Sequence, residues 1–213
     1  NHVLVQSLRD AWPHGRGVAV VNDLATEQNL ESLHAVGVRG TRFNLVQSGT
    51  TTVEMMDAVA RCVAPLSWHL QVHARPAELL QMEGLLMRLP VEVVLDHMAC
   101  IGENRQLQPE IEQCLRRLLG SGRAWLKFSA PYFSARDEAS HERLSRSVEM
   151  LIREFSDRLL WGSDWPHGTE ANKPDDAVMM DLLLGAASTL QVHRILVDNP
   201  AVVYDFGSEE RCC

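Results

Sequence analysis

The sequence predicts an α/β fold built on parallel strands. Short apolar runs rich in Val, Leu and Trp recur along the chain, stretches with helical spacing separate them, and ionisable residues stand where the runs end. Alternating strands and helices imply parallel strands joined by right-handed crossovers. Because 46% of the 213 residues are hydrophobic and 23% are charged, the composition is that of one globular domain, which we assign to residues 1–213.

The first twelve residues favour a helix over a strand. Leu4, Leu8 and Trp12 recur four apart, and Asn1 can cap the first turn. Beyond them, strands are expected at 17–22, 38–45, 68–73, 91–96, 124–129 and 159–163. Helices are expected at 27–35, 52–63, 77–89, 110–119, 140–155 and 175–187. A closed (β/α)8 barrel of the TIM type has eight strands in about 250 residues, so we expect a barrel of this type that lacks about its first two strands.

Charge and composition narrow the class of function. The chain holds 20 Lys and Arg residues against 28 Asp and Glu residues, a net charge of −8, which favours neither nucleic acid nor an anionic membrane as a partner. Apolar runs such as residues 91–95 are far shorter than the ~18 residues that cross a bilayer. Five cysteines without a disulfide or zinc-finger spacing are typical of a cytoplasmic protein. We therefore expect a small-molecule substrate, with a homo-oligomer as an open alternative to a monomer.

Polar side chains recur at the carboxyl ends of successive predicted strands. In parallel α/β proteins these ends lie together and carry the functional site. A single histidine at such a position is more often a structural residue, but recurrence on several strands favours a site. The residues concerned are Arg42, Asn44, His73, Asp96, His97, Ser129, Tyr132 and Asp164.

The segments that carry these residues resemble the amidohydrolase superfamily, in particular its branch with 2-pyrone-4,6-dicarboxylate lactonase and the sugar lactonases. The pair of motifs that is most specific is Asp96-His97 after one strand and Gly-Ser-Asp-Trp-Pro-His at 162–167 after another. The other similar segments are Val-Arg-Gly-Thr-Arg-Phe-Asn at 38–44, Trp-His-Leu-Gln-Val-His at 68–73 and Trp-Leu-Lys-Phe-Ser at 125–129.

This resemblance implies roles for individual residues. Asp164 would be the general base that activates water, against the alternative of a helix cap or structural aspartate. His97 would polarise the scissile carbonyl or hold the substrate, while Asp96 would orient a neighbouring group. Because neighbours on a strand point to opposite faces, only one of Asp96 and His97 is expected to face the barrel interior.

Further residues are expected to bind the substrate. Arg42 and Asn44 share one strand face, and Arg42 would either clamp a substrate carboxylate or pair with a buried acid. His73 would be a second polar group in the site or a metal ligand. Tyr132 and Trp165 would form pocket walls, with core packing as the alternative for Trp165. His167 would belong to the loop after the base or cap a helix.

The sequence also departs from the superfamily pattern. No His-x-His pair exists in the chain, so the metal ligands remain unknown. The resemblance leaves zinc or manganese open as a cofactor, and the lactonase branch does not require a divalent metal. Phe133 and Cys100 stand where the dicarboxylate lactonase carries arginines. We therefore expect a substrate with fewer negative charges, because an unpaired carboxylate in a closed pocket loses charge-assisted hydrogen bonds.

These observations favour a hydrolase that acts on a lactone or related cyclic ester through water activated by Asp164. Two alternatives remain. The first is a metal-dependent decarboxylase or hydratase on the same fold. The second is a truncated, non-catalytic barrel whose uncovered strand edge causes self-association.

Overall fold

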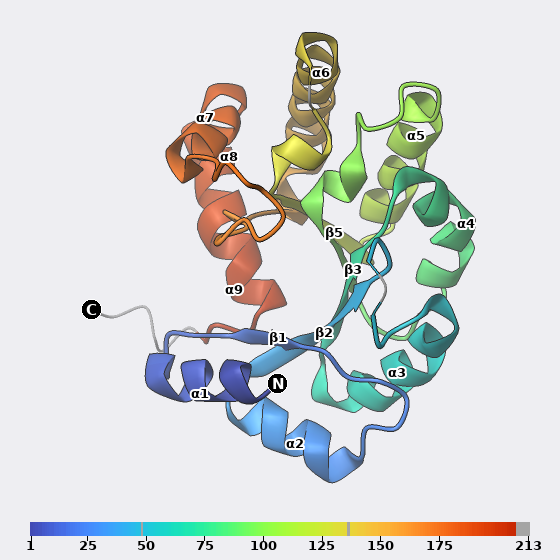
Figure 1. Cartoon of the computed structure of the whole chain (residues 1–213), viewed down its shortest axis with the longest axis vertical. Coiled ribbons are helices and arrows are strands. Elements are labelled where there is room, and N and C mark those ends of the chain that lie inside the picture. Colours follow the sequence, from blue (N-terminus) through green and yellow to red (C-terminus); the bar gives the residue numbers. More distant parts are fainter. Residues whose placement is uncertain (48, 136, 208–213) are drawn as a thin grey trace.

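Six parallel strands form one curled sheet in the computed structural model, which describes residues 1–47, 49–135 and 137–207. Each strand pairs with the next one in the chain, so the order in the sheet follows the sequence. The sheet curls into a half-barrel whose outer face is covered by helices (Figure 1). The strands are β1 (Gly17–Ala19), β2 (Val38–Asn44), β3 (His69–His73), β4 (Val93–Leu95), β5 (Ala124–Phe128) and β6 (Leu159–Trp161).

The first seven helices lie where the sequence predicts them, including the N-terminal one, whereas the helical segments after residue 188 lie outside the predicted ranges. Thr26 caps α2 and Asp137 caps α6 through side-chain bonds to backbone amides. Proline stands in the first turn of α4 and of α5, where its missing N–H is not needed. The helices are α1 (His2–Ala11), α2 (Glu27–Ala35), α3 (Met56–Val63), α4 (Pro76–Leu86), α5 (Gln108–Gly120), α6 (Glu138–Phe155), α7 (Asp176–Ala186), α8 (Thr189–His193) and α9 (Asn199–Val203), with a π-helical turn at Arg194–Asp198.

The main difference from prediction is at the strand ends. Strands expected to reach residues 22, 96 and 163 end at Ala19, Leu95 and Trp161. The segments after β4 and β6 turn away from the sheet direction, because His97 and Asp164 adopt left-handed backbone conformations. The half-barrel is confirmed, whereas the absence of about two strands stays a prediction.

Alternating strand residues divide the core into two parts. Large side chains on the outer face, such as Phe43, Leu70 and Leu126, pack against the helices. Their neighbours on the inner face form a smaller cluster of Val94, Trp125, Leu160 and Val203. This inner cluster fills one end of the half-barrel and leaves the opposite, carboxyl-terminal end to polar residues.

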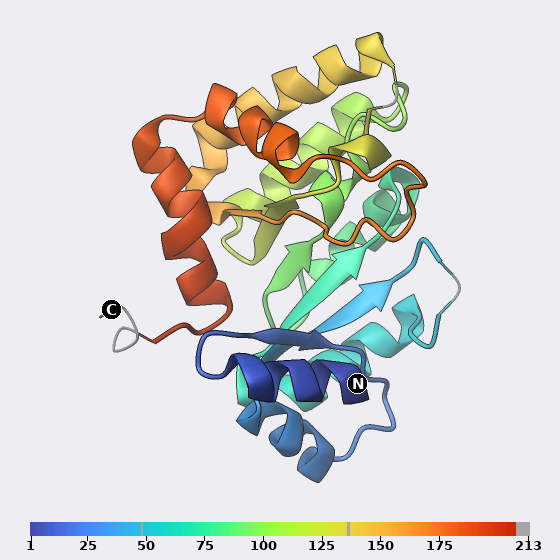
Figure 2. The same cartoon turned by 60° about the vertical axis from the view of Figure 1, so that its left-hand side comes forward.

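The C-terminal segment bridges the two edges of the sheet. Asn199 donates from Nδ2 to the carbonyl oxygens of Leu159 on β6 (2.6 Å) and of Ser156 (2.9 Å). Six residues later, the Asp205 carboxylate accepts from Nε of Arg39 on β2 at 3.0 Å. α9 therefore runs from β6 toward β1 and β2 (Figure 2).

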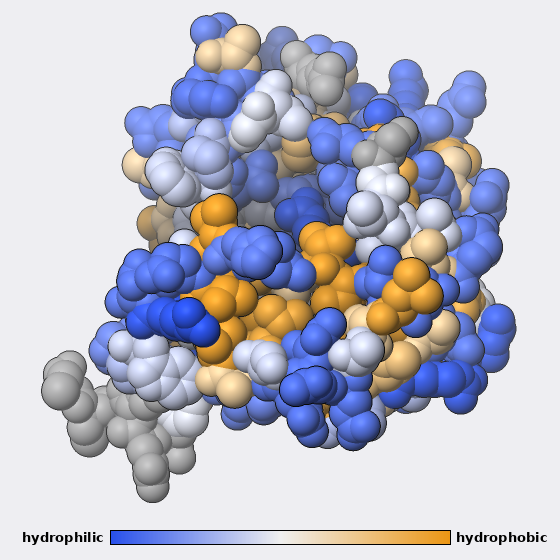
Figure 3. All heavy atoms as spheres, turned by 60° about the horizontal axis from the view of Figure 1, so that its bottom comes forward, coloured by the Kyte–Doolittle hydropathy of each residue, from blue (hydrophilic) through white to orange (hydrophobic). Residues whose placement is uncertain are grey.

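Apolar side chains also reach the surface on the face that carries α1 and α2, where they surround a hollow (Figure 3). Val20, beside β1, is 46% exposed and Leu24 is 80% exposed. Within the described part of the chain, every helix is too short or too polar to span a membrane.

Gly40 on β2 provides room for a buried histidine on β3. The His69 ring packs edge-on against Tyr204 with 5.3 Å between ring centroids. A Cβ atom on residue 40 would lie 2.5 Å from Nε2 of His69. The β2–β3 contact beneath the polar site thus requires glycine at this position.

We expect Gly40→Ala to lower the free energy of unfolding by about 1–3 kcal/mol, because the new methyl group displaces the His69 ring. Urea unfolding measures the change. Gly185→Ala on α7 is the control, since its Cβ would meet no atom within 4 Å and alanine is favoured over glycine in helices by about 1 kcal/mol. Equal effects of the two substitutions would contradict the prediction.

Candidate active site

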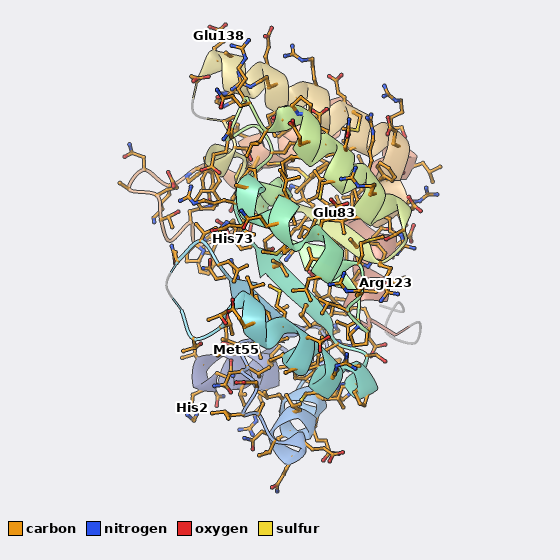
Figure 4. All side chains as sticks on the ribbon, turned by 90° about the vertical axis from the view of Figure 1, so that its right-hand side faces the viewer. His2, Met55, His73, Glu83, Arg123 and Glu138 are labelled. Carbon is orange, nitrogen blue, oxygen red and sulfur yellow. The ribbon has the colours of Figure 1, made fainter. Side chains whose placement is uncertain are left out.

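A cavity of about 440 Å³ opens at the carboxyl-terminal end of the strands. The predicted residues Arg42, Asn44, His73, His97 and Asp164 all line it. Figure 4 labels His73, the last residue of β3. A second, larger cavity of about 660 Å³ lies between residues 44–54 and α4, and its ionisable lining residues are Glu54 and Glu78. Because the smaller cavity gathers histidines, a carboxylate and an arginine, we take it as the candidate site.

A buried carboxylate, Asp96, lies at the base of this cleft. Its side chain is 1% exposed and meets Lys127 Nζ of β5 at 3.2 Å and Arg42 Nη2 of β2 at 3.5 Å. Gln71 of β3 donates to Asp96 at 2.8 Å and accepts from Lys127 at 2.8 Å. Burial alone would raise the pKa of Asp96, but the charges of Lys127 and Arg42 lower it to about 2. The cluster therefore joins three strands and the turn after β4 through one ionised carboxylate.

Asp96 and His97 both face the interior, so the expectation that only one of them could do so is wrong. β4 ends at Leu95, and His97, Met98, Ala99 and Cys100 then follow with φ between +50° and +53°. This left-handed turn breaks the alternation of strand side chains. Each such residue costs roughly 1–2 kcal/mol of backbone strain, and strain of this kind is concentrated at functional sites.

His97 is held as a neutral imidazole by two neighbours. Its Nε2 lies 3.3 Å from Nη2 of Arg42, and its Nδ1 lies 3.0 Å from Oγ of Ser129. Arginine can only donate, so Nε2 accepts and the ring proton is on Nδ1, which donates to Ser129. Burial lowers the pKa of His97, which agrees with the neutral form. Both ring nitrogens of His97 thus have a hydrogen-bond partner. The N–H groups that stay available to a ligand beside the ring belong to Arg42.

Arg42 pairs with a buried acid, which was one of its two expected roles, while its contact with a substrate carboxylate stays a prediction. It forms a long ion pair with the buried Asp96, yet its side chain is 34% exposed and lines the cleft. The guanidinium is thereby fixed in direction while part of it faces the cavity. Asn44, two residues further on, lines the cleft and accepts the backbone N–H of Val46 at 3.2 Å.

His73 forms one wall of the cleft with His97 and Phe133. The two imidazole rings pack edge to face with 4.5 Å between centroids, and Phe133 lies 5.7 Å from His73. Burial, followed by the neighbouring His97, lowers the pKa of His73 to about 4. His73 is therefore uncharged at neutral pH.

Asp164 presents one carboxylate oxygen to the cleft and has the other one fixed. Oδ2 accepts from the hydroxyl of Tyr132 at 2.5 Å, whereas Oδ1 lies 3.8 Å from Nε2 of His97. The side chain is 24% exposed, and the residue is left-handed with φ +64°. Tyr132 is therefore a hydrogen-bonding partner of Asp164, and its expected place in a pocket wall stays a prediction.

Trp165 and His167 both lie in the loop between β6 and α7. Trp165 is 76% exposed, so the alternative that it packs in the core is wrong, while substrate contact stays a prediction. His167 is 3% exposed and bonds to Tyr132 and Asp176.

Sequence reasoning missed Gln71, Lys127 and Asp176 as partners of the site. Gln71 and Lys127 each stand two residues before a predicted site residue, which is the signal that could have indicated them.

The metal alternative finds little support in the donor groups. Among residues 1–47, 49–135 and 137–207, no three His, Cys, Asp or Glu side chains are placed to hold one metal ion. Nε2 of His97, which faces Asp164, already accepts from Arg42. These residues do not fit a metal centre, and we derive no step through one.

The half-barrel thus carries a carboxylate, two histidines and an arginine at its strand ends, which is the arrangement expected of an α/β-barrel enzyme. The chain belongs to the amidohydrolase family, whose model matches residues 1–206.

Several relatives that act on lactones are similar to this chain in sequence. It is 29% identical over 218 residues to a 2-pyrone-4,6-dicarboxylate hydrolase from Comamonas testosteroni, covering 96% of this chain and 71% of the relative. It is 26% identical to a 4-sulfomuconolactone hydrolase from Rhizobium radiobacter (96% and 71% covered). It is also 26% identical to a D-galactarolactone isomerase from Agrobacterium fabrum (88% and 65% covered).

Solved structures support the fold. An apo structure from Agrobacterium tumefaciens has a TM-score of 0.87 at 23% identity, with 96% of this chain and 73% of that one covered. A zinc-bound amidohydrolase from Burkholderia multivorans has a TM-score of 0.76 at 17% identity, with 97% and 78% covered.

The neutral buried histidines make stability depend on pH. The pKa of His73 is lowered to about 4 and that of His69, mainly by burial, to about 3, from an ordinary 6.5. Between pH 6.5 and 4 the unfolded chain binds protons that these folded histidines do not bind. The free energy of unfolding should therefore fall on acidification through this window, by at most about 1.4 kcal/mol per pH unit for each histidine.

Urea unfolding between pH 4.5 and 7.5 measures this slope. His73→Gln should make the slope shallower, whereas His193→Gln, at an exposed histidine, should leave it unchanged. A slope that is the same in wild type and His73→Gln would contradict the assignment.

Proposed function

We propose that the protein hydrolyses a lactone or a related cyclic ester, with Asp164 as the general base. The observation that carries this proposal is the asymmetry of the Asp164 carboxylate, which has one oxygen fixed by Tyr132 and the other directed at the cleft beside Arg42 and His97. The lactone-acting relatives support the same class of substrate.

The proposed reaction begins with a water molecule between Oδ1 of Asp164 and the lactone carbonyl. Asp164 takes one proton from this water, and the resulting hydroxide attacks the carbonyl carbon. The exposed N–H groups of Arg42 stabilise the oxyanion, while His97 and Asp96 hold the guanidinium in place. The ring C–O bond then breaks, and the leaving alkoxide takes the proton from Asp164. Carbonyl polarisation by His97 itself would require that Arg42 or Ser129 release its ring.

The electrostatics of the cleft favour a neutral or singly charged substrate. Arg42 is the one lysine or arginine among the described lining residues, and it is shared with Asp96. Phe133, an apolar residue, forms the wall beside His73. A second substrate carboxylate would therefore meet no cationic partner, which costs several kcal/mol of charge-assisted bonding.

Other functions of the same site lead to different products. Lactone isomerisation, suggested by the Agrobacterium fabrum relative, would use a substrate hydroxyl in place of water and release no proton. A metal-dependent decarboxylase or hydratase would lose activity on chelation. A self-associating, non-catalytic barrel would show no turnover. Proton release measured in a pH-stat, with and without chelator, separates these cases.

We expect Asp164→Asn to reduce kcat on a lactone substrate by at least about 10²-fold, since the amide cannot accept a proton from water. Circular dichroism should be unchanged. Asp181→Asn, at an exposed position on α7, is the matched control and should retain wild-type kcat. Wild-type turnover in Asp164→Asn would remove Asp164 as the base.

Substrate charge should affect kcat/KM strongly. A neutral sugar lactone should be hydrolysed with a kcat/KM at least about tenfold above that of a dianionic lactone of similar size. Phe133→Arg should raise kcat/KM for the dianion and leave that for the neutral lactone nearly unchanged. A wild-type preference for the dianion would overturn the charge argument.

A further inference from the structure

A second cation lies beneath the cleft without lining it. Lys127 projects from β5, and its side chain is 16% exposed. Its Nζ lies 3.2 Å from Oδ1 of Asp96 and donates to Oε1 of Gln71 at 2.8 Å. Nζ also lies 6.0 Å from the centre of the Tyr204 ring. Because Lys127 is not among the described residues that line the cleft, it can act on a substrate only through its neighbours.

Lys127 and Gln71 surround the same carboxylate that Arg42 faces. Gln71 donates from Nε2 to Oδ2 of Asp96 at 2.8 Å, whereas Nη2 of Arg42 lies 3.5 Å from the same oxygen. A charge-assisted hydrogen bond between a guanidinium and a carboxylate is about 2.7–2.9 Å long. Arg42 is therefore attracted to Asp96 without closing onto it, and its Nη2 lies 3.3 Å from Nε2 of His97 instead.

The charges beneath the cleft do not cancel. Arg42 and Lys127 are positive and Asp96 is negative, while both His73 and His97 are neutral. Burial lowers the pKa of Lys127, but the charge of Asp96 outweighs burial and raises the pKa, so the ammonium is charged at neutral pH. The base of the cleft thus holds one positive charge in excess. Without Lys127, Arg42 and Asp96 would form a pair of opposite charges with no excess for a ligand.

Lactone hydrolysis requires such an excess in its transition state. As Asp164 takes a proton from water, its own negative charge disappears and a new one develops on the carbonyl oxygen. Groups that are already oriented, and whose charge is not neutralised by another group, stabilise an oxyanion best. Arg42 meets this condition because Lys127 compensates Asp96 in its place.

We propose that Lys127 is a positioning residue that compensates the charge of Asp96 and so leaves Arg42 available to the oxyanion. This role rests on the proposed hydrolytic function of the site. Asp96 gives the guanidinium its direction, and Lys127 together with Gln71 keeps the guanidinium from closing onto the carboxylate.

The first test is independent of turnover. Lys127→Met removes the charge and keeps a side chain of similar length. Arg42 should then close onto Asp96, and the distance from Nη2 to Oδ2 should shorten from 3.5 Å to about 2.8 Å in a crystal structure of the variant. Should Lys127→Met not fold, Gln71→Leu provides the same measurement, since it keeps both cations and removes the competing donor to Oδ2. An Arg42 guanidinium that stays in place would overturn the proposal.

The second test measures kinetics on the lactone that wild type hydrolyses. Lys127→Met should lower kcat about tenfold or more with little change in KM, because the lost stabilisation belongs to the transition state. Combining Asp96→Asn with Lys127→Met removes the opposing charge as well and should restore part of the loss. Arg88→Met removes one positive charge at an exposed position after α4 and should match wild type.

The outcomes separate the two proposals. A loss in Lys127→Met that Asp96→Asn does not restore indicates a purely structural role of the lysine and overturns the proposal, as does a wild-type kcat in Lys127→Met. Absence of lactone hydrolysis by wild type rejects the proposed function instead. The position of Arg42 in the variant crystals then still decides whether Lys127 keeps it from closing onto Asp96.

Discussion

The arrangement of the site depends on one ionised carboxylate buried between strands. Asp96 is surrounded by Lys127, Gln71 and Arg42, which come from β5, β3 and β2. A buried charge is costly unless it is paired and hydrogen-bonded. Asp96 therefore needs all three partners, and the partners need the carboxylate. Arg42 is in turn fixed beside His97, and His97 lies 3.8 Å from Asp164. The directions of Arg42 and His97 in the cleft can thus be traced to the compensation of a single negative charge.

Backbone strain at the site has a related cause. The left-handed turn at residues 97–100 would be unfavourable in isolation, but all four side chains are buried and the turn is closed by a bond from the Ile101 amide to the Met98 carbonyl. Packing of the buried side chains therefore stabilises a left-handed backbone conformation that these residues do not prefer. The same conformation at Asp164 turns the carboxylate across the barrel end toward Tyr132.

The strand and helix pattern could be predicted because apolar spacing and proline positions are local properties, as the agreement at β3 and α2 illustrates. Recurrence of polar residues at strand ends was enough to indicate Arg42, His73, His97 and Asp164 as cleft residues. The inward direction of both Asp96 and His97 could not be read from alternation, because it depends on a non-repetitive turn. The bond between His167 and Tyr132 joins residues 35 positions apart, which no spacing rule connects.

The bridge formed by residues 199–205 bears on how the protein acquires its structure. Neighbouring strands pair over separations of a few tens of residues, but Arg39 and Asp205 are 166 residues apart and Arg16 and Asp205 are 189 apart. Contacts of such long range form slowly, since the entropy of a large loop is lost before any contact is gained. The sheet can therefore assemble progressively from adjacent βα units, with the joining of its two margins as the last and most non-local event.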